Sequence, residues 1–413
     1  MDPIIDQDLA TFGAVNLEGP KWCGKTWTAL AHSQSALFLM DPAGDFANHR
    51  LAELDPASVL DGASPRLLDE WQEVPSLWDA VRFHVDQTGK SGEFIMTGST
   101  KPHTSPRHSG TGRIVRRRLR PMSLVESGDS TGHASIAALL AGQRLRPASS
   151  TMTLDKLISL CQRGGWPGAL SSDDNAALNL AVSYLDQLAR VDVSTASDSA
   201  RDAAKVSAAL GSLARNTATL VQIPTIRRDM AQWFGSTATD TTVRVYLDSL
   251  RALHVLEEIP AWSPNLRSST RLRKSPKRML VDPSLALAAI GASRDSLRAD
   301  LKTFGFIFES LCLRDLLVIA DTNSGQMWHY HDDSGLEVDA VITWQDGRWG
   351  AFEIKLGSAQ VDAAASNLLR LAASVQYGGN RKPALLAVIV GVGGVAQTRP
   401  DGVHVIPVDL FGP

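Results

Sequence analysis

The residues with the most specific chemical spacing lie near the N-terminus. Positions 19–26 read Gly-Pro-Lys-Trp-Cys-Gly-Lys-Thr and fill a G-x-x-x-x-G-K-[ST] phosphate-binding loop through Gly19, Gly24, Lys25 and Thr26. Glycines allow the backbone N–H groups to point at phosphates, where a Cβ would obstruct the approach. Lys25 is expected to contact the β and γ phosphates, and Thr26 to hold Mg²⁺. The motif therefore predicts ATP and Mg²⁺ as cofactors.

A short apolar strand ends in two carboxylates, Asp69 and Glu70. Asp69 is expected beside the Mg²⁺, because open α/β sheets bind ligands at the carboxyl ends of their strands, and Glu70 could polarise the attacking water as a catalytic residue. A further strand over 93–99 ends in Thr97 and Ser99, of which Ser99 is the candidate for sensing the γ phosphate. An Asp-Glu pair is also common in solvated turns, so this interpretation depends on the phosphate loop.

A second group of chemically informative residues lies near the C-terminus. Two segments with a side-chain period of two residues are joined by the turn Gln345-Asp346-Gly347. They predict a hairpin that carries Asp339 on one strand and Glu353 and Lys355 on the other. Carboxylate pairs suit Mg²⁺, which keeps waters that can attack a phosphodiester, and Lys355 would stabilise the developing charge. Periodicity alone favours a plainer interpretation, a hairpin with charged residues on its exposed face.

The order of these motifs resembles a bacterial and archaeal family of AAA+-like ATPases with a C-terminal restriction-endonuclease-like domain. The segments that carry the resemblance are GPKWCGKT, LLDEWQEVPSLWDAV, IMTGST, GRIVRRRLRPMSLVE, GGWPGAL, YLDQLARVDV, RLRKSPKRMLVDPSLAL, GLEVDAVI and AFEIKLG. The resemblance implies that Asp339 and Glu353 bind metal and that Glu309, on a predicted helix, is an additional metal ligand. It also places a strand near 114–120, with Arg113 as a candidate phosphate-sensing or finger arginine. Such domains often supply an arginine across a subunit interface, so a homo-oligomer is an expected assembly.

The sequence predicts that an α/β protein of four parts positions these residues. An AAA+-like P-loop NTPase core is expected over 1–125, and an Ala-, Leu- and Ser-rich stretch over 126–200 predicts a helical lid. Residues 201–285 carry a helix-turn-helix pattern that predicts a winged helix. Residues 286–413 are expected to form the α/β restriction-endonuclease-like domain.

Basic residues without any acidic neighbour cluster between 265 and 278, where a wing would lie. Winged helices bind DNA by placing a helix in the major groove while basic wing residues hold phosphates, but they also serve as protein-interaction modules. The expected nucleic-acid contacts are Arg267, Arg271, Arg273, Lys274, Lys277 and Arg278.

Composition excludes several other classes of protein. The 413 residues are 44% hydrophobic and 21% charged, which suits packed domains, and the net charge of −3 argues against a coat of nucleic acid over the whole surface. The three cysteines form no CxxC pair, so neither a disulfide framework nor a zinc knuckle is indicated. The acidic N-terminus and the lack of a run of about 18 apolar residues predict a cytoplasmic protein that neither enters nor spans a membrane.

These features favour an enzyme that binds and hydrolyses ATP and that regulates or positions a metal-dependent nuclease-like domain acting on nucleic acid. The alternative is a nucleotide-switched module that binds DNA or protein without cleaving it. A third hypothesis, a defence or toxin-like element, is an expectation from resemblance alone.

Overall fold

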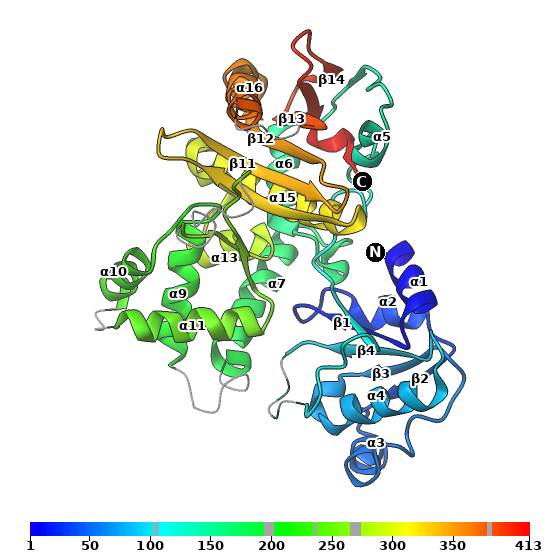
Figure 1. The fold of residues 1–413 in the computed structure, drawn as a ribbon. Coiled ribbons are helices and arrows are strands. Elements are labelled where there is room, and N and C mark those ends of the chain that lie inside the picture. The colour runs from blue at the N-terminus through cyan, green and yellow to red at the C-terminus, as the bar shows by residue number, and fades with distance from the viewer. Residues whose placement is uncertain are drawn as a thin grey trace. The chain divides into compact units, whose positions relative to one another are not determined.

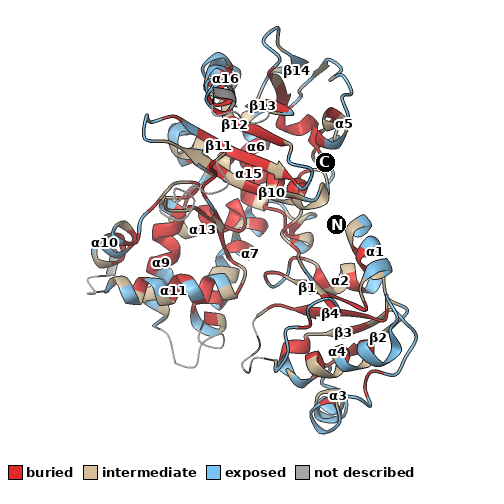
Figure 2. Cartoon of the chain, viewed as in Figure 1, coloured by how far each residue is buried: buried red, intermediate tan, exposed pale blue. Residues whose placement is uncertain are grey.

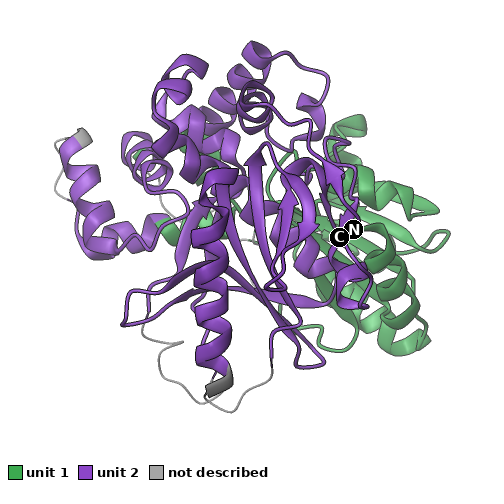
Figure 3. Ribbon diagram, turned by 90° about the horizontal axis from the view of Figure 1, so that it is seen from above, with its two compact units in different colours: residues 1–121, 188–202, 247–255 green, residues 122–187, 203–246, 256–413 purple. Residues whose placement is uncertain are grey.

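The fold is described from a computed structural model of the chain. It describes residues 1–100, 102, 104, 106–193, 202–234, 238–264, 274–377 and 382–413. The chain divides into two compact units, coloured separately in Figure 3. The first unit comprises residues 1–121, 188–202 and 247–255, and the second comprises residues 122–187, 203–246 and 256–413.

The first unit contains a five-stranded sheet with the order β2-β3-β4-β1-β5 (Figure 1). Its strands are β1 (Ala14–Glu18), β2 (Ser35–Phe38), β3 (Arg66–Asp69), β4 (Phe94–Gly98) and β5 (Ile114–Arg118). Each pair of neighbours is parallel. The carboxyl ends of all five strands therefore lie at one edge of the sheet, and the strands expected before Asp69, over 93–99 and near 114–120 are confirmed.

Helices cover both faces of this sheet because its strands alternate apolar side chains between them. The helices are α1 (Asp2–Thr11), α2 (Lys25–Ala31), α3 (Ala43–Leu54) and α4 (Ser76–Thr88), with a short turn η1 (Trp71–Glu73) after β3. Leu77 and Trp78 of α4 pack with Met96 of β4 on one face, whereas Ile5 of α1 packs with Val15 of β1 on the other. Figure 2 shows the inner strands β1 and β4 as mainly buried. Leu77, Val81 and Val85 recur every four residues along α4 and are all buried.

The second unit contains a mixed seven-stranded sheet with the order β10-β11-β12-β13-β15-β14-β7. The C-terminal strands are β10 (Gly325–His331), β11 (Glu337–Trp344), β12 (Trp349–Gly357), β13 (Leu385–Val392), β14 (Val395–Thr398) and β15 (His404–Pro407). The predicted hairpin is β11 and β12, which pair antiparallel, while β12 and β13 are parallel. A long helix, α15 (Leu301–Thr322), precedes β10, and α16 (Val361–Tyr377) with the short turn η4 (Ser358–Gln360) connects β12 to β13.

Two short segments from the middle of the chain pair with C-terminal strands. Strand β7 (Ala148–Ser149) pairs with β14, and β6 (Ala134–Ser135) pairs with the last strand, β16 (Phe411–Gly412), after the turn η5 (Val408–Leu410). The structure therefore groups residues 122–187 with the C-terminal sheet. This grouping differs from the expected lid over 126–200, because backbone pairing over more than two hundred residues leaves no local pattern in the sequence.

The remaining helices of the second unit form a helix-rich region. They are α5 (Ile136–Leu140), α6 (Leu154–Arg163), α7 (Asp174–Gln187), α9 (Ala203–Arg215), α10 (Ile223–Phe234), α13 (Pro283–Ile290) and α14 (Arg294–Ala299), with the turn η2 (Pro167–Ala169). In this region α9 packs against α10 and α13, and α13 packs against α7. The π-type turn η3 (Leu188–Asp192) belongs to the first unit, and α11 (Asp240–Ala252) contributes to both units. An antiparallel pair, β8 (Leu256–Ile259) and β9 (Lys277–Leu280), follows α11. In the part of the chain that is described, every helix is too short or too polar to cross a bilayer.

A buried polar network explains two motifs that the predicted chemistry does not use, Gly164-Gly165 and Val281-Asp282-Pro283-Ser284. Asp282 is fully buried and accepts hydrogen bonds from the backbone N–H of Gly165 (2.9 Å) and from Nη1 of Arg314 on α15 (2.9 Å). Gly164 has a φ of +67°, and a Cβ there would lie 2.2 Å from Oδ1 of Asp282. The glycine pair thus allows a loop to approach the network that anchors α15, the helix carrying Glu309.

Candidate functional site

The phosphate-binding loop joins β1 to α2 at the carboxyl edge of the parallel sheet. Gly24 has a φ of 101°, in the left-handed region that favours glycine, directly before α2 begins at Lys25. A Cβ on Gly19 would lie 2.3 Å from the carbonyl oxygen of Leu119, so this position needs glycine for close backbone packing. Nζ of Lys25 donates to the carbonyl oxygens of Gly19 (3.1 Å) and Pro20 (2.9 Å), and this holds the ammonium inside the loop.

Asp69 joins the loop to the neighbouring strands. Its Oδ1 accepts hydrogen bonds from Oγ1 of Thr26 (2.8 Å) and from Oγ1 of Thr97 (2.7 Å). Burial raises the pKa of the Asp69 carboxyl, against the opposing effect of these two hydroxyl donors. Thr26 and Asp69 place a hydroxyl and a carboxylate oxygen side by side, and such hard oxygen ligands suit Mg²⁺. The donor set therefore fits the metal that the sequence predicts.

Glu70 is held next to this group in a left-handed backbone conformation, with a φ of 58°. Its Oε2 accepts hydrogen bonds from Oγ of Ser99 (3.0 Å) and from the amide of Gln72, and its backbone N–H donates to Oγ1 of Thr97 (3.1 Å). The structure thus brings Ser99 to Glu70, and Thr97 to both carboxylate residues. Gln72 is an addition that the sequence pattern did not indicate.

Asn16 and Glu18, which interrupt the apolar pattern of β1, have a structural role at the same edge. Asn16 is fully buried, accepts a hydrogen bond from Nε1 of Trp71 (2.9 Å) and donates one to Oε1 of Glu18 (2.8 Å). Oε1 of Glu18 also accepts from Nη1 of Arg116 (2.8 Å). This chain of hydrogen bonds ties β1 to the turn after β3, where Glu70 lies.

The prediction that Arg113 contacts the phosphates is wrong. Arg113 precedes the first residue of β5, and its carbonyl oxygen accepts from the N–H of Ala14 at the start of β1. It therefore lies at the amino edge of the sheet, opposite the phosphate loop, where Nε forms an ion pair with Asp86 (2.6 Å). Strand direction decides the matter: Arg118, at the other end of β5, pairs in register with Glu18 and lies at the phosphate edge.

The second candidate site brings Asp339, Glu353 and Lys355 together in the second unit. Nζ of Lys355 lies 2.5 Å from Oε2 of Glu353 and 3.3 Å from Oδ2 of Asp339. Oδ2 of Asp339 also accepts from the N–H of Ile354 (2.8 Å), and Oε1 of Glu353 accepts from Nδ2 of Asn367 on α16 (3.2 Å). The charged residues of the predicted hairpin thus face one another instead of lying apart on a solvated face.

Lys277, a predicted nucleic-acid contact, instead completes this group. Nζ of Lys277 lies 2.7 Å from Oε1 of Glu309, 3.7 Å from Oδ1 of Asp339 and 3.7 Å from Oε1 of Glu337, and its side chain is 1% exposed. Glu309 therefore joins the cluster through the ammonium group of a buried lysine. Lys277 lies in a run of basic residues, and such runs usually form solvated surfaces, so the sequence did not indicate its place in the cluster.

The predicted basic surface needs correction for the same reason. Lys277 and Arg278 are buried in β9, where Nε of Arg278 pairs with Glu258 (2.8 Å), so neither is available to a phosphate backbone. Nζ of Lys274 donates to the carbonyl oxygen of His331 and lies 3.4 Å from Oδ1 of Asp333, so this ammonium group already has partners. The other predicted contacts, Arg267, Arg271 and Arg273, lie outside the described residues.

The charges in this cluster shift one another's pKa values strongly. Burial raises the pKa of Glu309 and of Glu353 to about 7. Burial also acts to raise the pKa of Asp339, but the ammonium groups of Lys277 and Lys355 outweigh it and hold that pKa below its ordinary value. The surrounding carboxylates in turn raise the pKa of both lysines despite their burial. Perturbed groups that converge in this way are typical of functional sites and of structural ion networks.

In this structure the ammonium groups of Lys277 and Lys355 neutralise the negative charge of the carboxylates. Among the described residues, no group of three His, Cys, Asp or Glu side chains is arranged to hold a metal ion. Lys355 is 24% exposed, so it can turn aside, and Asp339 and Glu353 would then present the oxygen ligands that Mg²⁺ prefers. Lys277 has no such freedom, so one oxygen of Glu309 stays committed to it. The metal-binding roles of Glu309, Asp339 and Glu353 stay predictions.

Comparison with known proteins identifies the type of domain that the N-terminal region forms. Residues 11–127 match the family model of an AAA domain, residues 154–296 match a domain of unknown function (DUF8612), and residues 304–411 match another (DUF4143). Uncharacterized proteins of Mycobacterium tuberculosis and Mycobacterium bovis are each 28% identical to this chain over 354 residues, which cover 83% of it and 70% of each relative. The N-terminal region, with its parallel α/β sheet and phosphate loop, is thus an AAA-like domain of the ATP-binding type.

Proposed function

We propose that the protein hydrolyses ATP with Mg²⁺ at the carboxyl edge of the parallel sheet. The observation that carries this proposal is the hydrogen-bonded group of Thr26, Asp69 and Thr97, with Glu70 held beside it by Ser99. It combines two oxygen ligands suited to a magnesium ion with a carboxylate placed next to them. A phosphate loop without catalysis would not need Glu70 to be held in place.

Each side chain has a separate part in this reaction. Lys25 would exchange its bonds to the carbonyl oxygens of Gly19 and Pro20 for the β and γ phosphates. Thr26 and Asp69 would hold Mg²⁺, which neutralises phosphate charge, and Glu70 would orient the attacking water. Because Ser99 donates to Glu70, a γ phosphate that drew the Ser99 hydroxyl away would release the carboxylate for catalysis.

The test compares ATP binding and ATP turnover in matched variants. Glu70→Gln should bind ATP with nearly wild-type affinity but turn it over at least about 100-fold more slowly, the usual contribution of a positioned general base. Lys25→Ala should lose ATP binding. Glu53→Gln, which changes an exposed carboxylate on α3, should behave as wild type. Undiminished turnover by Glu70→Gln would refute the role of Glu70, and full binding by Lys25→Ala would refute the site.

The cluster around Asp339 supports a second function, metal-dependent cleavage of nucleic acid. The order α15-β10-β11-β12-α16-β13, with Asp339 on β11 and Glu353 and Lys355 on β12, is the arrangement expected of a restriction-endonuclease-like domain. Asp339 and Glu353 would bind Mg²⁺, which activates water for attack on the phosphodiester, and Lys355 would stabilise the developing negative charge. The helices α9 to α11 followed by the β8–β9 pair support a winged helix beside it.

Cleavage is tested with purified protein, Mg²⁺ or Mn²⁺, and labelled DNA and RNA. The proposal expects products from wild-type protein, none from Glu353→Ala or Lys355→Ala, and wild-type yields from Lys382→Ala, which removes an exposed lysine outside the cluster. ATP-dependent complexes without products would favour the alternative, a nucleotide-switched interaction module. Regulation of this site by ATP predicts that nucleic acid stimulates ATP turnover, and a homo-oligomer predicts a larger particle mass with ATP.

A further inference from the structure

Two cavities in the second unit share a wall formed by the first turns of α15. One has a volume of about 780 Å³ and reaches Glu309 and Lys355 of the carboxylate cluster, and the other has a volume of about 460 Å³. Lys302 and Phe306 line both cavities. These residues are four positions apart and Glu309 follows three later, so all three lie along one face of α15. This face runs from the second cavity to the carboxylate cluster.

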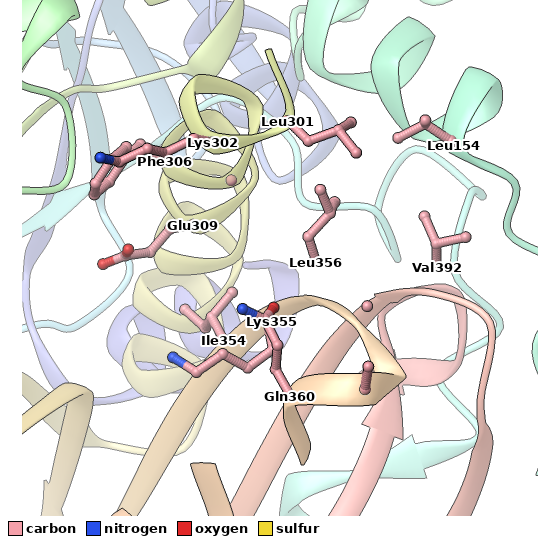
Figure 4. Close-up of a pocket in the computed structure, with 13 residues that line it drawn as sticks. Leu154, Leu301, Lys302, Phe306, Glu309, Ile354, Lys355, Leu356, Gln360 and Val392 are labelled. Carbon is pink, nitrogen blue, oxygen red and sulfur yellow. The ribbon is translucent and has the colours of Figure 1, made fainter. Parts of the chain in front are cut away.

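The first cavity combines an apolar wall with charge at one end. Leu301, Leu356 and Val392 provide aliphatic surface, whereas Glu309 and Lys355 provide charge. Figure 4 shows Lys302, Phe306 and Glu309 on one side of the cavity and these aliphatic side chains on the other. Phe306 is 39% exposed although it is a large aromatic residue. A ligand here would need a flat apolar group to cover that ring.

The second cavity has apolar side chains in its lining together with two cationic groups. It is lined by Lys302, by Arg215, whose side chain is 62% exposed although it pairs with Asp229, and by Thr217. The hydroxyl of Thr217 is buried and has no hydrogen-bond partner among the described residues. The acidic residue of this lining, Asp300, accepts hydrogen bonds from the backbone N–H (3.0 Å) and the hydroxyl (2.6 Å) of Thr303. The cavity thus suits an anionic ligand such as a phosphate group.

We propose that Lys302 and Phe306 form the path along which a single-stranded nucleic acid reaches the Asp339–Glu353–Lys355 cluster, an inference that rests on the proposed nuclease-like function. Bases stack on Phe306 against the aliphatic wall, and phosphates lie over Lys302 and Arg215. Alternating aromatic and cationic contacts are how proteins bind single strands. A continuous duplex keeps its bases stacked inside, so it would leave Phe306 and the aliphatic wall uncovered. The chemistry of the path therefore selects single strands.

The test measures binding in EDTA, where cleavage cannot contribute. Wild-type protein should bind a fluorescein-labelled 12-nucleotide oligo(dT) more tightly than a blunt 12-base-pair duplex. Phe306→Ala should raise the single-strand Kd by about 5-fold to about 150-fold, the usual loss when a stacking aromatic is removed, and Phe306→Trp should restore binding. Lys302→Ala should reduce the dependence of log K on log salt by about 0.7, because one phosphate contact is lost.

Matched controls separate this path from general surface effects. Phe83→Ala removes an aromatic side chain that is 58% exposed on α4, and Lys382→Ala removes an exposed lysine; both should bind as wild type. The proposal is overturned if wild-type protein prefers the duplex or binds neither probe, or if Phe306→Ala and Lys302→Ala bind the single strand as wild type does. Binding without cleavage would refute the proposed nuclease function alone, whereas cleavage that is unaffected by both variants would refute the path alone.

Discussion

Replacing Lys277 with methionine tests whether the buried ammonium holds the C-terminal cluster together. Methionine keeps an unbranched apolar side chain but removes the charge. Nζ of Lys277 lies 2.7 Å from Oε1 of Glu309 and 3.7 Å from Oδ1 of Asp339, and the lysine side chain is 1% exposed. Its removal takes away the ammonium group that pairs with both carboxylates. Lys355 still contacts Asp339, but its ammonium does not replace the lost bond to Glu309.

The expected cost follows from the burial of the charges. Removing one partner of a buried ion pair typically costs about 3 to 5 kcal/mol, because the remaining charge stays out of water. Glu309 can lessen this cost by taking up a proton, since burial already raises its pKa to about 7 with Lys277 present. Without the ammonium that pKa rises further above the unfolded value. The folded variant then binds more protons than its unfolded chain, so the stability of the variant falls as pH rises.

Hydrogen exchange measured by mass spectrometry on peptides from β9 and β11 is the appropriate assay. The chain has two compact units, so its unfolding is not expected to be a single two-state transition, whereas exchange reports the opening of chosen strands. Lys277→Met should lose protection equivalent to about 3 to 5 kcal/mol at about pH 8 and less at about pH 6. Lys382→Met, which replaces an exposed lysine, should lose none.

A second variant tests whether the unpaired carboxylate of Glu309 causes the loss of protection. Adding Glu309→Gln to Lys277→Met removes the unpaired carboxylate charge, so the double variant should regain part of the protection. Protection in Lys277→Met that stays within about 1 kcal/mol of wild type at about pH 8 would refute the stabilising role of the ammonium group. A double variant less protected than the single one would show that the unpaired carboxylate is not the source of the loss.

Three further predictions follow from other contacts. Thr97→Val removes the hydroxyl that bonds Asp69 and the N–H of Glu70, so ATP turnover should fall at least about 10-fold with little change in ATP affinity; equal turnover would contradict it. Gly164→Ala places a Cβ 2.2 Å from Oδ1 of Asp282 at a φ of +67°, and should lower the melting temperature of the second unit far more than Gly142→Ala, where φ is +80° but nothing lies within 4 Å. Burial lowers the pKa of His329 from 6.5 to about 4, so the folded state binds fewer protons than the unfolded chain between these values. His329 should therefore cost about 3 kcal/mol of stability as pH falls from about 6.5 to about 4, and the pH dependence of unfolding should weaken in His329→Gln.

The sequence alone was sufficient where chemistry depends on neighbouring positions. Gly24, Lys25 and Thr26 are adjacent in the chain, so the motif specified a strand, a turn and a helix N-terminus, and the structure has β1 and α2 in those places. The hairpin with Glu353 and Lys355 followed in the same way from a period of two residues and a turn. Turn geometry and side-chain alternation are local properties, and this is why these elements could be predicted.

The sequence failed where the answer depended on strand direction or on burial. Arg113, next to Gly112 in a basic segment, is a predicted phosphate contact, but the parallel sheet places that end of β5 away from the loop. Lys277 and Arg278 were assigned to a nucleic-acid surface because they end a basic run, but both are buried in β9. A charge run contains no information about which of its members turns inward, because the compensating carboxylates of Lys277 lie more than thirty residues away.

The sequence by itself determined the kinds of chemistry that this protein can carry, a phosphate loop with two following carboxylates and a later pair of carboxylates with a lysine. Tertiary structure alone decided which groups meet. It placed Thr97 on Asp69 and Ser99 on Glu70, and it inserted Lys277 between Glu309 and Asp339. The physical reason is that side-chain identity and local periodicity are written in adjacent residues, whereas the compensation of a buried charge depends on which distant segments pack together.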